Sequence, residues 1–487
     1  MAQQHPVLLV ILDGFGDAPS SSTNAIQAAA MPHLSAWKRQ YPHSLLEAAG
    51  QAVGLPDGYP GNSEVGHMTI GAGTIIPQPL TIINQAMHDK TIQTNPLLTA
   101  ALDRSAHAGR TVHIIGLMSH AGVHSEMAHL NAYLDAAVAA GVSDIVIHAI
   151  LDGRDTPAKS AEVYLSELET VLTTYPQARL GTIQGRFYAM DRDGNWDRTC
   201  ASFACLTGNT PVDERSWRTC ITDSYNQQIT DEFIRPTRLI EDSAISDGDG
   251  VICIQFRPER MGQLIRCLFG HSPCHIPQVK PDYIITPVSY GPELDTTVLF
   301  PSTYHDGGLK QRVSEAGKKI FAIAETEKYA HVTYFFSGGT HEPFPGETQV
   351  LIPSIKTRTY ADYPCMSAPQ ITDRVLRSLH DDPADLYIIN YANADMVGHS
   401  GNMSATVKAV ECLDTQLARL YDQVVPHGGA LIITADHGKA EDMTTPAHTS
   451  NKVPFLLISN NAHHYKDMMP KKGLSEIAHL VEKLVIP

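Results

Sequence analysis

The sequence lacks the features that mark several large classes of proteins. Its 36 lysines and arginines stand against 52 acidic residues, a formal net charge of −16, so it has no basic surplus for holding nucleic acid or an anionic membrane. No apolar run approaches the roughly 18 residues of a membrane span. The N-terminal MAQQHPVLLVILDG has no cationic segment and ends its short apolar run on an acid, unlike a signal peptide. We therefore expect a soluble, cytoplasmic protein that binds neither nucleic acid nor membrane.

The eight cysteines also lack a pattern. No C-x-x-C spacing occurs among them, so neither a zinc ribbon nor a thioredoxin-type site is indicated. Cysteines scattered through a long chain are typical of reduced thiols in a cytoplasmic protein. The sequence predicts that they do not form disulfides.

Short apolar runs do recur, and many are followed by a stretch with helical character. Strands alternating with helices predict an α/β fold with parallel sheets, in which ligands bind at the carboxyl ends of the strands. The predicted strands cover residues 7–12, 112–117, 145–150, 178–183, 250–256, 319–323, 332–336, 386–391 and 430–434, and the predicted helices include residues 161–173 and 404–424.

Two turn-rich segments divide the chain, one at residues 77–79 and the other at residues 301–308 (PSTYHDGG). A length of 487 residues corresponds to two or three units at roughly 100–200 residues per domain. We predict a discontinuous first domain, residues 1–76 and 305–487, and an inserted second domain, residues 77–304.

Three apolar runs of the first domain lead into an aspartate, and histidines follow two of them. If the strands are parallel neighbours, the carboxylates converge at one sheet edge and repel one another unless cations hold them. Carboxylate and imidazole ligands together suit Mn²⁺ or Zn²⁺ better than Ca²⁺. Each aspartate alone also fits a helix cap or an Asx turn, but the whole set favours a metal centre. The candidate ligands are Asp13, Asp395, His399, Asp436, His437 and His448.

A serine lies in the Gly-rich segment GYPGNSEVGHMTIGAG, where a helix is expected to begin. Backbone N–H groups at a helix N-terminus bind phosphate, and a metal ion can activate a serine hydroxyl as a nucleophile. Ser63 is therefore a candidate nucleophile. The alternative is that Ser63 or Asn62 only caps the helix.

The predicted strand ends of the second domain carry positive charge. Arginine forks match the oxygens of phosphate and carboxylate, so the set predicts a pocket for a small molecule with two anionic ends, although each arginine alone also fits a surface ion pair. Asp155 follows Arg154 and is either a general base for a substrate hydroxyl or the salt-bridge partner of that arginine. The residues are His124, Arg154, Asp155, Arg186, Arg192, Arg257 and Arg260.

Ten segments, in order and spanning nearly the whole chain, resemble the cofactor-independent phosphoglycerate mutases of the alkaline phosphatase superfamily. They are DGFG, VGLPDGYPGNSEVGH, AGVHS, LDGRDTP, GRFYAMDRD, FRPER, AETEKYAHVTYFFSGG, NADMVGH, TADHG and HTSNKVPF. The resemblance implies an alkaline-phosphatase-like α/β core with an inserted α/β domain. It also implies interconversion of 3-phosphoglycerate and 2-phosphoglycerate in glycolysis and gluconeogenesis by a monomeric isomerase.

By position, the resemblance implies two Mn²⁺ ions, with Co²⁺ or Zn²⁺ as substitutes. One ion would be held by Asp13, Ser63, Asp436 and His437, and the other by Asp395, His399 and His448. Ser63 would carry the phosphoryl group, and Lys328 would reach the phosphate. The seven residues of the second domain would bind substrate, with Asp155 as the base, and that domain is expected to close over the metal domain.

The sequence departs from the family pattern at His120, Glu126, Lys439 and the glutamate of FRPER, Glu259, and its loop before His448 is short. None is a proposed ligand or the nucleophile, so they bear on the surroundings of the site rather than on the reaction. Two rival functions share the metal centre, a phosphatase or phosphomutase acting on another substrate and a metal-dependent binding protein. Only the latter would tolerate loss of Ser63.

Overall fold

The computed structural model describes residues 5–301 and 307–486. The chain divides into two units, one formed by Met1–Gln78 with Tyr304–Pro487 and the other by Pro79–Thr303. The sequence-based boundaries fall at 76/77 and 304/305, and the second of them lies outside the described residues. None of the helices in the described residues is long and apolar enough to cross a membrane.

The first unit is built on a mixed seven-stranded sheet in the order β11-β10-β12-β1-β13-β14-β2. The five strands from β11 to β13 are parallel, and β14 and β2 are antiparallel to their neighbours. The strands are β1 (Val7–Leu12), β2 (His43–Leu46), β10 (Ile320–Glu325), β11 (Glu347–Ile352), β12 (Leu386–Tyr391), β13 (Ala430–Thr434) and β14 (Val453–Ile458).

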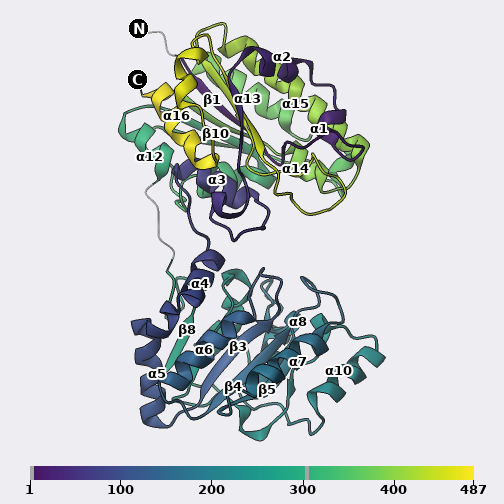
Figure 1. Ribbon diagram of the computed structural model, residues 1–487, viewed down its shortest axis with the longest axis vertical. Helices are drawn as coiled ribbons and strands as arrows, with labels where there is room; N and C mark the ends of the chain where they lie inside the picture. Colours follow the sequence, from purple (N-terminus) through teal and green to yellow (C-terminus); the bar gives the residue numbers. More distant parts are fainter. Residues whose placement is uncertain (1–4, 302–306, 487) are drawn as a thin grey trace. The chain divides into compact units, whose positions relative to one another are not determined.

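Helices cover both faces of this sheet, which explains why its central strands are apolar without alternation. All six residues of β1 and of β12 are buried. Helices α3, α12 and α16 contact one another in one layer, whereas α1, α2 and α13 contact α15 in the other (Figure 1). The helices are α1 (Ala25–Ala28), α2 (Pro32–Gln40), α3 (Ser63–Ala72), α12 (Gly308–Glu315), α13 (Ala368–Asp381), α14 (Asn393–Gly398), α15 (Met403–Val424) and α16 (Ile477–Val485).

The second unit has its own seven-stranded sheet in the order β6-β5-β4-β3-β7-β8-β9, parallel except for β6. Side chains of β3 alternate between two apolar clusters, Ile114 in one and Ile115 in the other, because successive residues point to opposite faces. The strands are β3 (Val112–Met118), β4 (Ile145–Leu151), β5 (Ala178–Gly185), β6 (Thr237–Arg238), β7 (Gly250–Cys253), β8 (Tyr283–Thr286) and β9 (Thr297–Val298).

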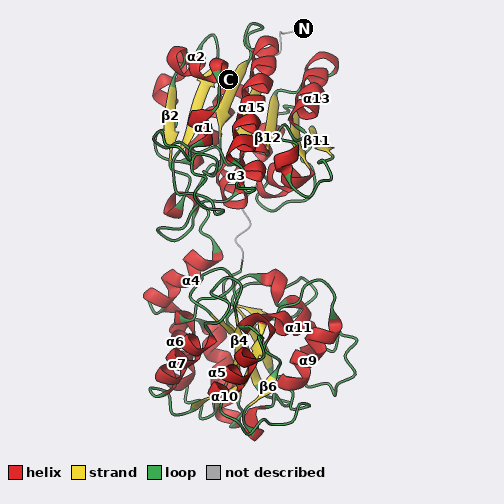
Figure 2. Ribbon diagram, turned by 90° about the vertical axis from the view of Figure 1, so that its right-hand side faces the viewer, coloured by secondary structure: helices red, strands yellow, loops and turns green. Residues whose placement is uncertain are grey.

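Helices α6 and α7 pack on one face of this sheet, and α9 and α11 pack on the other (Figure 2). The helices are α4 (Pro79–His88), α5 (Pro96–Ala108), α6 (Ala128–Ala139), α7 (Ala161–Leu172), α8 (Arg186–Ala189), α9 (Trp196–Leu206), α10 (Trp217–Asn226) and α11 (Gly262–Leu268). The predicted α/β class with parallel sheets is confirmed.

One predicted strand is wrong. Residues 332–335 lie in a helical turn, His331–Phe335, which ends at Phe336 and follows the short turn Thr326–Lys328. Val332 and Phe336 are both fully buried, and their spacing of four places them on one face of a helix. A short apolar run cannot be assigned to a strand or a helix by periodicity alone.

The prediction that the cysteines are all reduced thiols is also wrong. Cys200 is bonded to Cys274 and Cys365 to Cys412, with Cα atoms 5.3 and 5.7 Å apart, within the usual range for a disulfide. Each bond joins positions far apart in the sequence, so no spacing pattern reveals it. The four free cysteines, Cys205, Cys220, Cys253 and Cys267, are buried.

Candidate metal centre and anion site

Three neighbouring strands of the first unit deliver the aspartates. Asp13 directly follows β1, which lies between β12 and β13. In register, Leu12 pairs with Tyr391 and Ile11 with Thr434, so the three strands end at one edge. Asp395 and Asp436 therefore lie beside Asp13, and the three carboxylates of Asp13, Asp395 and Asp436 are nearly inaccessible to solvent, at 0%, 2% and 0% exposure.

The first ligand group consists of Asp13, Asp436 and His437. His437 Nε2 lies 3.4 Å from an Asp13 oxygen and 3.6 Å from an Asp436 oxygen. Ser63 Oγ joins this group, because it donates to Asp13 Oδ1 at 3.0 Å and lies 3.0 Å from His437 Nε2. Asn62 caps α3 by accepting from Val65 N. Asn62 is therefore the residue that caps the helix, and the Ser63 hydroxyl is available to bond Asp13.

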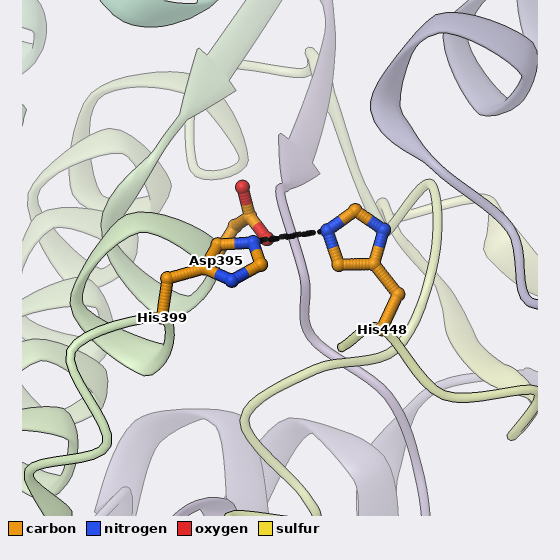
Figure 3. Close-up of side chains that lie close together, drawn as sticks. All are labelled: Asp395, His399 and His448. Carbon is orange, nitrogen blue, oxygen red and sulfur yellow. Dashed lines mark hydrogen bonds and ion pairs between the residues drawn. The ribbon is translucent and has the colours of Figure 1, made fainter. Parts of the chain in front are cut away.

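The second group consists of Asp395, His399 and His448 (Figure 3). The two Nε2 atoms lie 3.0 Å apart, and they lie 3.1 and 3.3 Å from Asp395 Oδ1. Both Nδ1 atoms donate to backbone carbonyls, that of His399 to Pro446 and that of His448 to Gly61, each at 2.9 Å.

This arrangement fits a metal ion. With the protons on Nδ1, two neutral imidazoles point their Nε2 lone pairs at each other and at a carboxylate, which is repulsive unless a cation lies between them. Ligand atoms about 2.0–2.1 Å from a tetrahedral ion lie roughly 3.3 Å from one another, close to the observed spacings. Asp395 Oδ1 and Asp436 Oδ2 are buried, and neither accepts a hydrogen bond from the described part of the chain.

Lys328 lies between the two groups. Its ammonium donates to Asp13 Oδ1 and Asp395 Oδ2, both at 2.7 Å, and to Ser63 Oγ at 2.6 Å. Burial disfavours the charged form, but the Asp13 and Asp395 carboxylates outweigh it and raise the pKa of Lys328. Burial also lowers the pKa of His437, but the nearby carboxylates, that of Asp436 most strongly, outweigh it and raise this pKa to about 9. Three buried carboxylates against one ammonium and one imidazolium leave a net negative charge, which favours a further cation.

Sequence reasoning missed two residues that orient these ligands. His67 Nδ1 donates to the Ser63 carbonyl at 2.8 Å and lies 3.2 Å from Asp436 Oδ2. Asn390 Nδ2 donates to Asp13 Oδ2 at 2.8 Å and to His67 Nε2 at 3.0 Å. The available signals were the spacing of four between Ser63 and His67 on one helix and the lone amide in the apolar strand LYIINY.

In the second unit, a buried guanidinium organises the anion site. Arg186 Nη1 donates to Asp152 at 2.7 Å and to Asp155 at 2.5 Å, and its Nη2 donates to His124 Nε2 at 2.9 Å. Asp155 thus pairs with Arg186, and Arg154 pairs with Glu232 instead, which corrects the alternative of an Asp155–Arg154 salt bridge. Asp152, a buried residue that directly follows β4, was not recognised from the sequence.

His124 presents an unused donor. Burial, and next the positive charge of Arg186, lower its pKa to about 4, so the imidazole is neutral near pH 7. Because Nε2 accepts from Arg186, the proton is on Nδ1, which is buried without a hydrogen-bond partner in the described residues. A carboxylate or phosphate oxygen would satisfy it.

The remaining arginines add positive charge around this site. Arg154, Arg192 and Arg257 keep side-chain exposures of 58%, 47% and 47%. Burial and then the charges of Arg192, Arg186 and Arg154 lower the pKa of Arg260, and its Nε is buried and unpartnered within the described ranges. Arginines that repel one another in this way favour an anion among them.

Three of the departures from the family pattern, His120, Glu126 and Lys439, have local partners. His120 lies between Glu126 and Glu167, at 2.5 and 2.9 Å, and these carboxylates outweigh desolvation and raise its pKa. Lys439 is fully buried and donates to the Thr445 carbonyl at 3.0 Å, three residues before His448. The departures therefore fix segments that carry predicted site residues.

A model of the Metalloenzyme superfamily matches residues 5–486, so the chain belongs to that superfamily. This match and the two candidate ligand groups together support the use of divalent metal ions.

The particular family follows from its relatives. The chain is 43% identical to the 2,3-bisphosphoglycerate-independent phosphoglycerate mutase of Acaryochloris marina, over 93% of this chain and 86% of that protein. It is 41% identical to that of Pseudomonas syringae pv. syringae, over 94% and 92%. The Leishmania mexicana phosphoglycerate mutase structure, crystallised at low cobalt concentration, matches with a TM-score of 0.71 at 28% identity, over 99% and 95% of the two chains. The chain belongs to the 2,3-bisphosphoglycerate-independent phosphoglycerate mutases.

Proposed function

We propose that this chain interconverts 3-phosphoglycerate and 2-phosphoglycerate through a phosphoserine at Ser63, without 2,3-bisphosphoglycerate, as an isomerase of glycolysis and gluconeogenesis. One observation carries the proposal. Ser63 Oγ lies among Asp13, His437 and Lys328, at 2.6–3.0 Å from each, where cations bound by the carboxylates would join Lys328 in holding a phosphate beside the nucleophilic oxygen.

We propose two Mn²⁺ ions, with Co²⁺ or Zn²⁺ as substitutes, since mixed nitrogen and oxygen ligands suit all three. Asp13, Ser63, Asp436 and His437 would hold one ion, and Asp395, His399 and His448 the other. Bound there, the ions would acidify the serine hydroxyl and neutralise charge on the phosphate oxygens.

The protein groups would then act in sequence. Ser63 Oγ attacks the phosphorus in line while the Lys328 ammonium stabilises the equatorial oxygens. The Ser63–phosphorus bond forms, the bond to the glycerate oxygen breaks, and the proton lost by the Ser63 hydroxyl ends on that glycerate oxygen. Asp155 next removes the proton from the other glycerate hydroxyl, whose oxygen attacks the phosphoserine. The bond between Ser63 Oγ and phosphorus breaks, and the proton taken by Asp155 returns to Ser63.

The second unit would hold the glycerate. The Nδ1–H of His124 and the guanidinium groups around it suit a carboxylate and a phosphate, and the substrate residues we propose are His124, Arg154, Asp155, Arg186, Arg192, Arg257 and Arg260. We propose a monomer in the cytoplasm, where the phosphorylated intermediates of glycolysis occur.

An enolase-coupled assay with 3-phosphoglycerate tests the function. The protein is stripped with EDTA, resupplied with Mn²⁺ and assayed without 2,3-bisphosphoglycerate, beside Ser63→Ala and Ser404→Ala, a control on an exposed position of α15. We expect Mn²⁺-dependent turnover in the wild type and the control, and none in Ser63→Ala. An inactive wild type that releases phosphate from an aryl phosphate would instead assign a phosphatase.

A further inference from the structure

Glu441 is a buried carboxylate outside both ligand groups and outside the reaction proposed above. It lies between His437 and His448 in the sequence, and 1% of its surface is exposed. Its Oε2 accepts from Gly16 N at 3.1 Å and from Lys439 N at 2.8 Å. Its Oε1 accepts from Asn451 Nδ2 at 3.1 Å and from the Thr449 hydroxyl. All four donors thus converge on one side chain.

These donors come from the segments that carry metal ligands. Gly16 lies three residues after Asp13, Lys439 two after His437, and Thr449 directly after His448. The first two segments supply the first ligand group, and the third supplies His448 of the second group. One carboxylate therefore links segments of both groups, through backbone donors on the first side and side-chain donors on the second.

Two glycines let the backbone approach this carboxylate. A Cβ at Gly16 would lie 2.2 Å from the Glu441 carboxyl carbon, and a Cβ at Gly438 would lie 2.3 Å from Oε1. Real contacts are not that short, so a side chain at either position would displace the carboxylate or its own segment. The packing, as well as the hydrogen bonds, therefore sets where the ligand-bearing segments lie.

We propose that Glu441 is a positioning residue that fixes the spacing between the two metal-ligand groups, an inference that rests on the two-metal function proposed above. Groups that orient metal ligands commonly change metal affinity 10–100-fold when they are replaced. A glutamine at 441 has one acceptor oxygen, and its NH₂ group would face two of the present donors. Replacement should thus release two of the four contacts while keeping the size of the side chain.

Asp414 offers a matched control in the same unit. Its carboxylate is 3% exposed and accepts from the backbone N–H groups of His33 at 3.2 Å and Leu34 at 2.8 Å. Those donors belong to α2, outside the ligand-bearing segments. Asp414→Asn therefore removes an equivalent buried charge and leaves the metal centre untouched.

The experiment is a Mn²⁺ titration of the full-length, EDTA-stripped protein, followed by electron paramagnetic resonance, with melting of the metal-free proteins alongside. We expect Glu441→Gln to weaken Mn²⁺ binding about 10–100-fold at both sites. Asp414→Asn should lower the melting temperature and leave the Mn²⁺ dissociation constants at their wild-type values. Unchanged dissociation constants in Glu441→Gln, or equal weakening in Asp414→Asn, would overturn the proposal.

A milder variant covers the case in which Glu441→Gln does not fold. Thr449→Val removes the hydroxyl next to His448, which donates to Glu441 and accepts from Asn451 N at 3.3 Å. We expect weaker Mn²⁺ binding at the second site alone, and wild-type binding in this variant would refute the linkage. The titration needs no turnover. A wild type that binds two Mn²⁺ but lacks mutase activity would refute the proposed function alone, and a wild type that binds none would refute both.

Discussion

Protonation of His129 should destabilise the second unit at acidic pH. This histidine of α6 is 2% exposed, and its Nε2 donates to Asn84 Oδ1 of α4 at 2.7 Å. Its Nδ1 is buried and has no hydrogen-bond partner in the described residues. Burial lowers the pKa of His129 to about 4, because a second N–H would be a buried charge without an acceptor.

The size of the effect follows from linkage. The pKa of His129 is 6.5 in the unfolded chain and about 4 in the folded one. Each unit of pKa difference corresponds to about 1.36 kcal/mol, so full protonation lowers the free energy of unfolding by about 3 kcal/mol. Between these values the unfolded chain binds a proton that the folded chain does not bind. Stability is therefore unaffected above pH 6.5 and falls as the pH drops from 6.5 to 4.

His129→Gln isolates this contribution, because the glutamine amide can still donate to Asn84 and does not titrate. Urea unfolding at pH 7.5 and 4.5 would be followed by tryptophan fluorescence, since Trp196 and Trp217 lie in the second unit. Between pH 7.5 and 4.5, the free energy of unfolding of the wild type should fall by about 2.5 kcal/mol more than that of the variant. His107→Gln, at an exposed position, should behave like the wild type. Equal losses in His129→Gln and the wild type would refute the reasoning.

Two further predictions concern the anion site and the disulfides. Arg186→Lys should lower kcat/KM at least about 100-fold, because one ammonium cannot replace the planar guanidinium that bonds Asp152, Asp155 and His124. A coupled assay in which kcat/KM changes less than threefold would contradict this. Peptide mapping without reductant should recover the Cys200–Cys274 and Cys365–Cys412 pairs. Because the bonded cysteines are 74 and 47 positions apart, reducing either bond should lower the free energy of unfolding by up to about 4 kcal/mol in the chain-entropy model. Urea unfolding with and without a phosphine measures this loss. Eight titratable thiols in the denatured, unreduced protein would contradict the pairing.

The site was predictable where its chemistry follows local patterns. An apolar run that leads into an aspartate marks a strand end, and β1, β12 and β13 begin and end at the predicted residues. Parallel strands bring such ends to one edge, so the grouping of Asp13, Asp395 and Asp436 follows from the order of residues along the chain. The predicted strand at residues 250–256 ends early, at Cys253, because boundaries depend on which backbone groups find a partner strand.

Other features depended on neighbours that are distant in the sequence. The helical turn at His331–Phe335 and the two disulfides are decided by burial and by Cα proximity. Likewise, Asp155 adjoins Arg154 in the chain but pairs with Arg186, because the strand ends bring the latter guanidinium closer.

The sequence by itself determined the α/β class, the convergence of the aspartates and the identity of the family, because hydrophobic periodicity and long ordered motifs are local properties of the chain. Only the tertiary structure showed the facing lone pairs of His399 and His448, the orienting contacts of His67 and Asn390, and the four donors around Glu441. Those depend on the distance and direction between side chains, which packing alone sets.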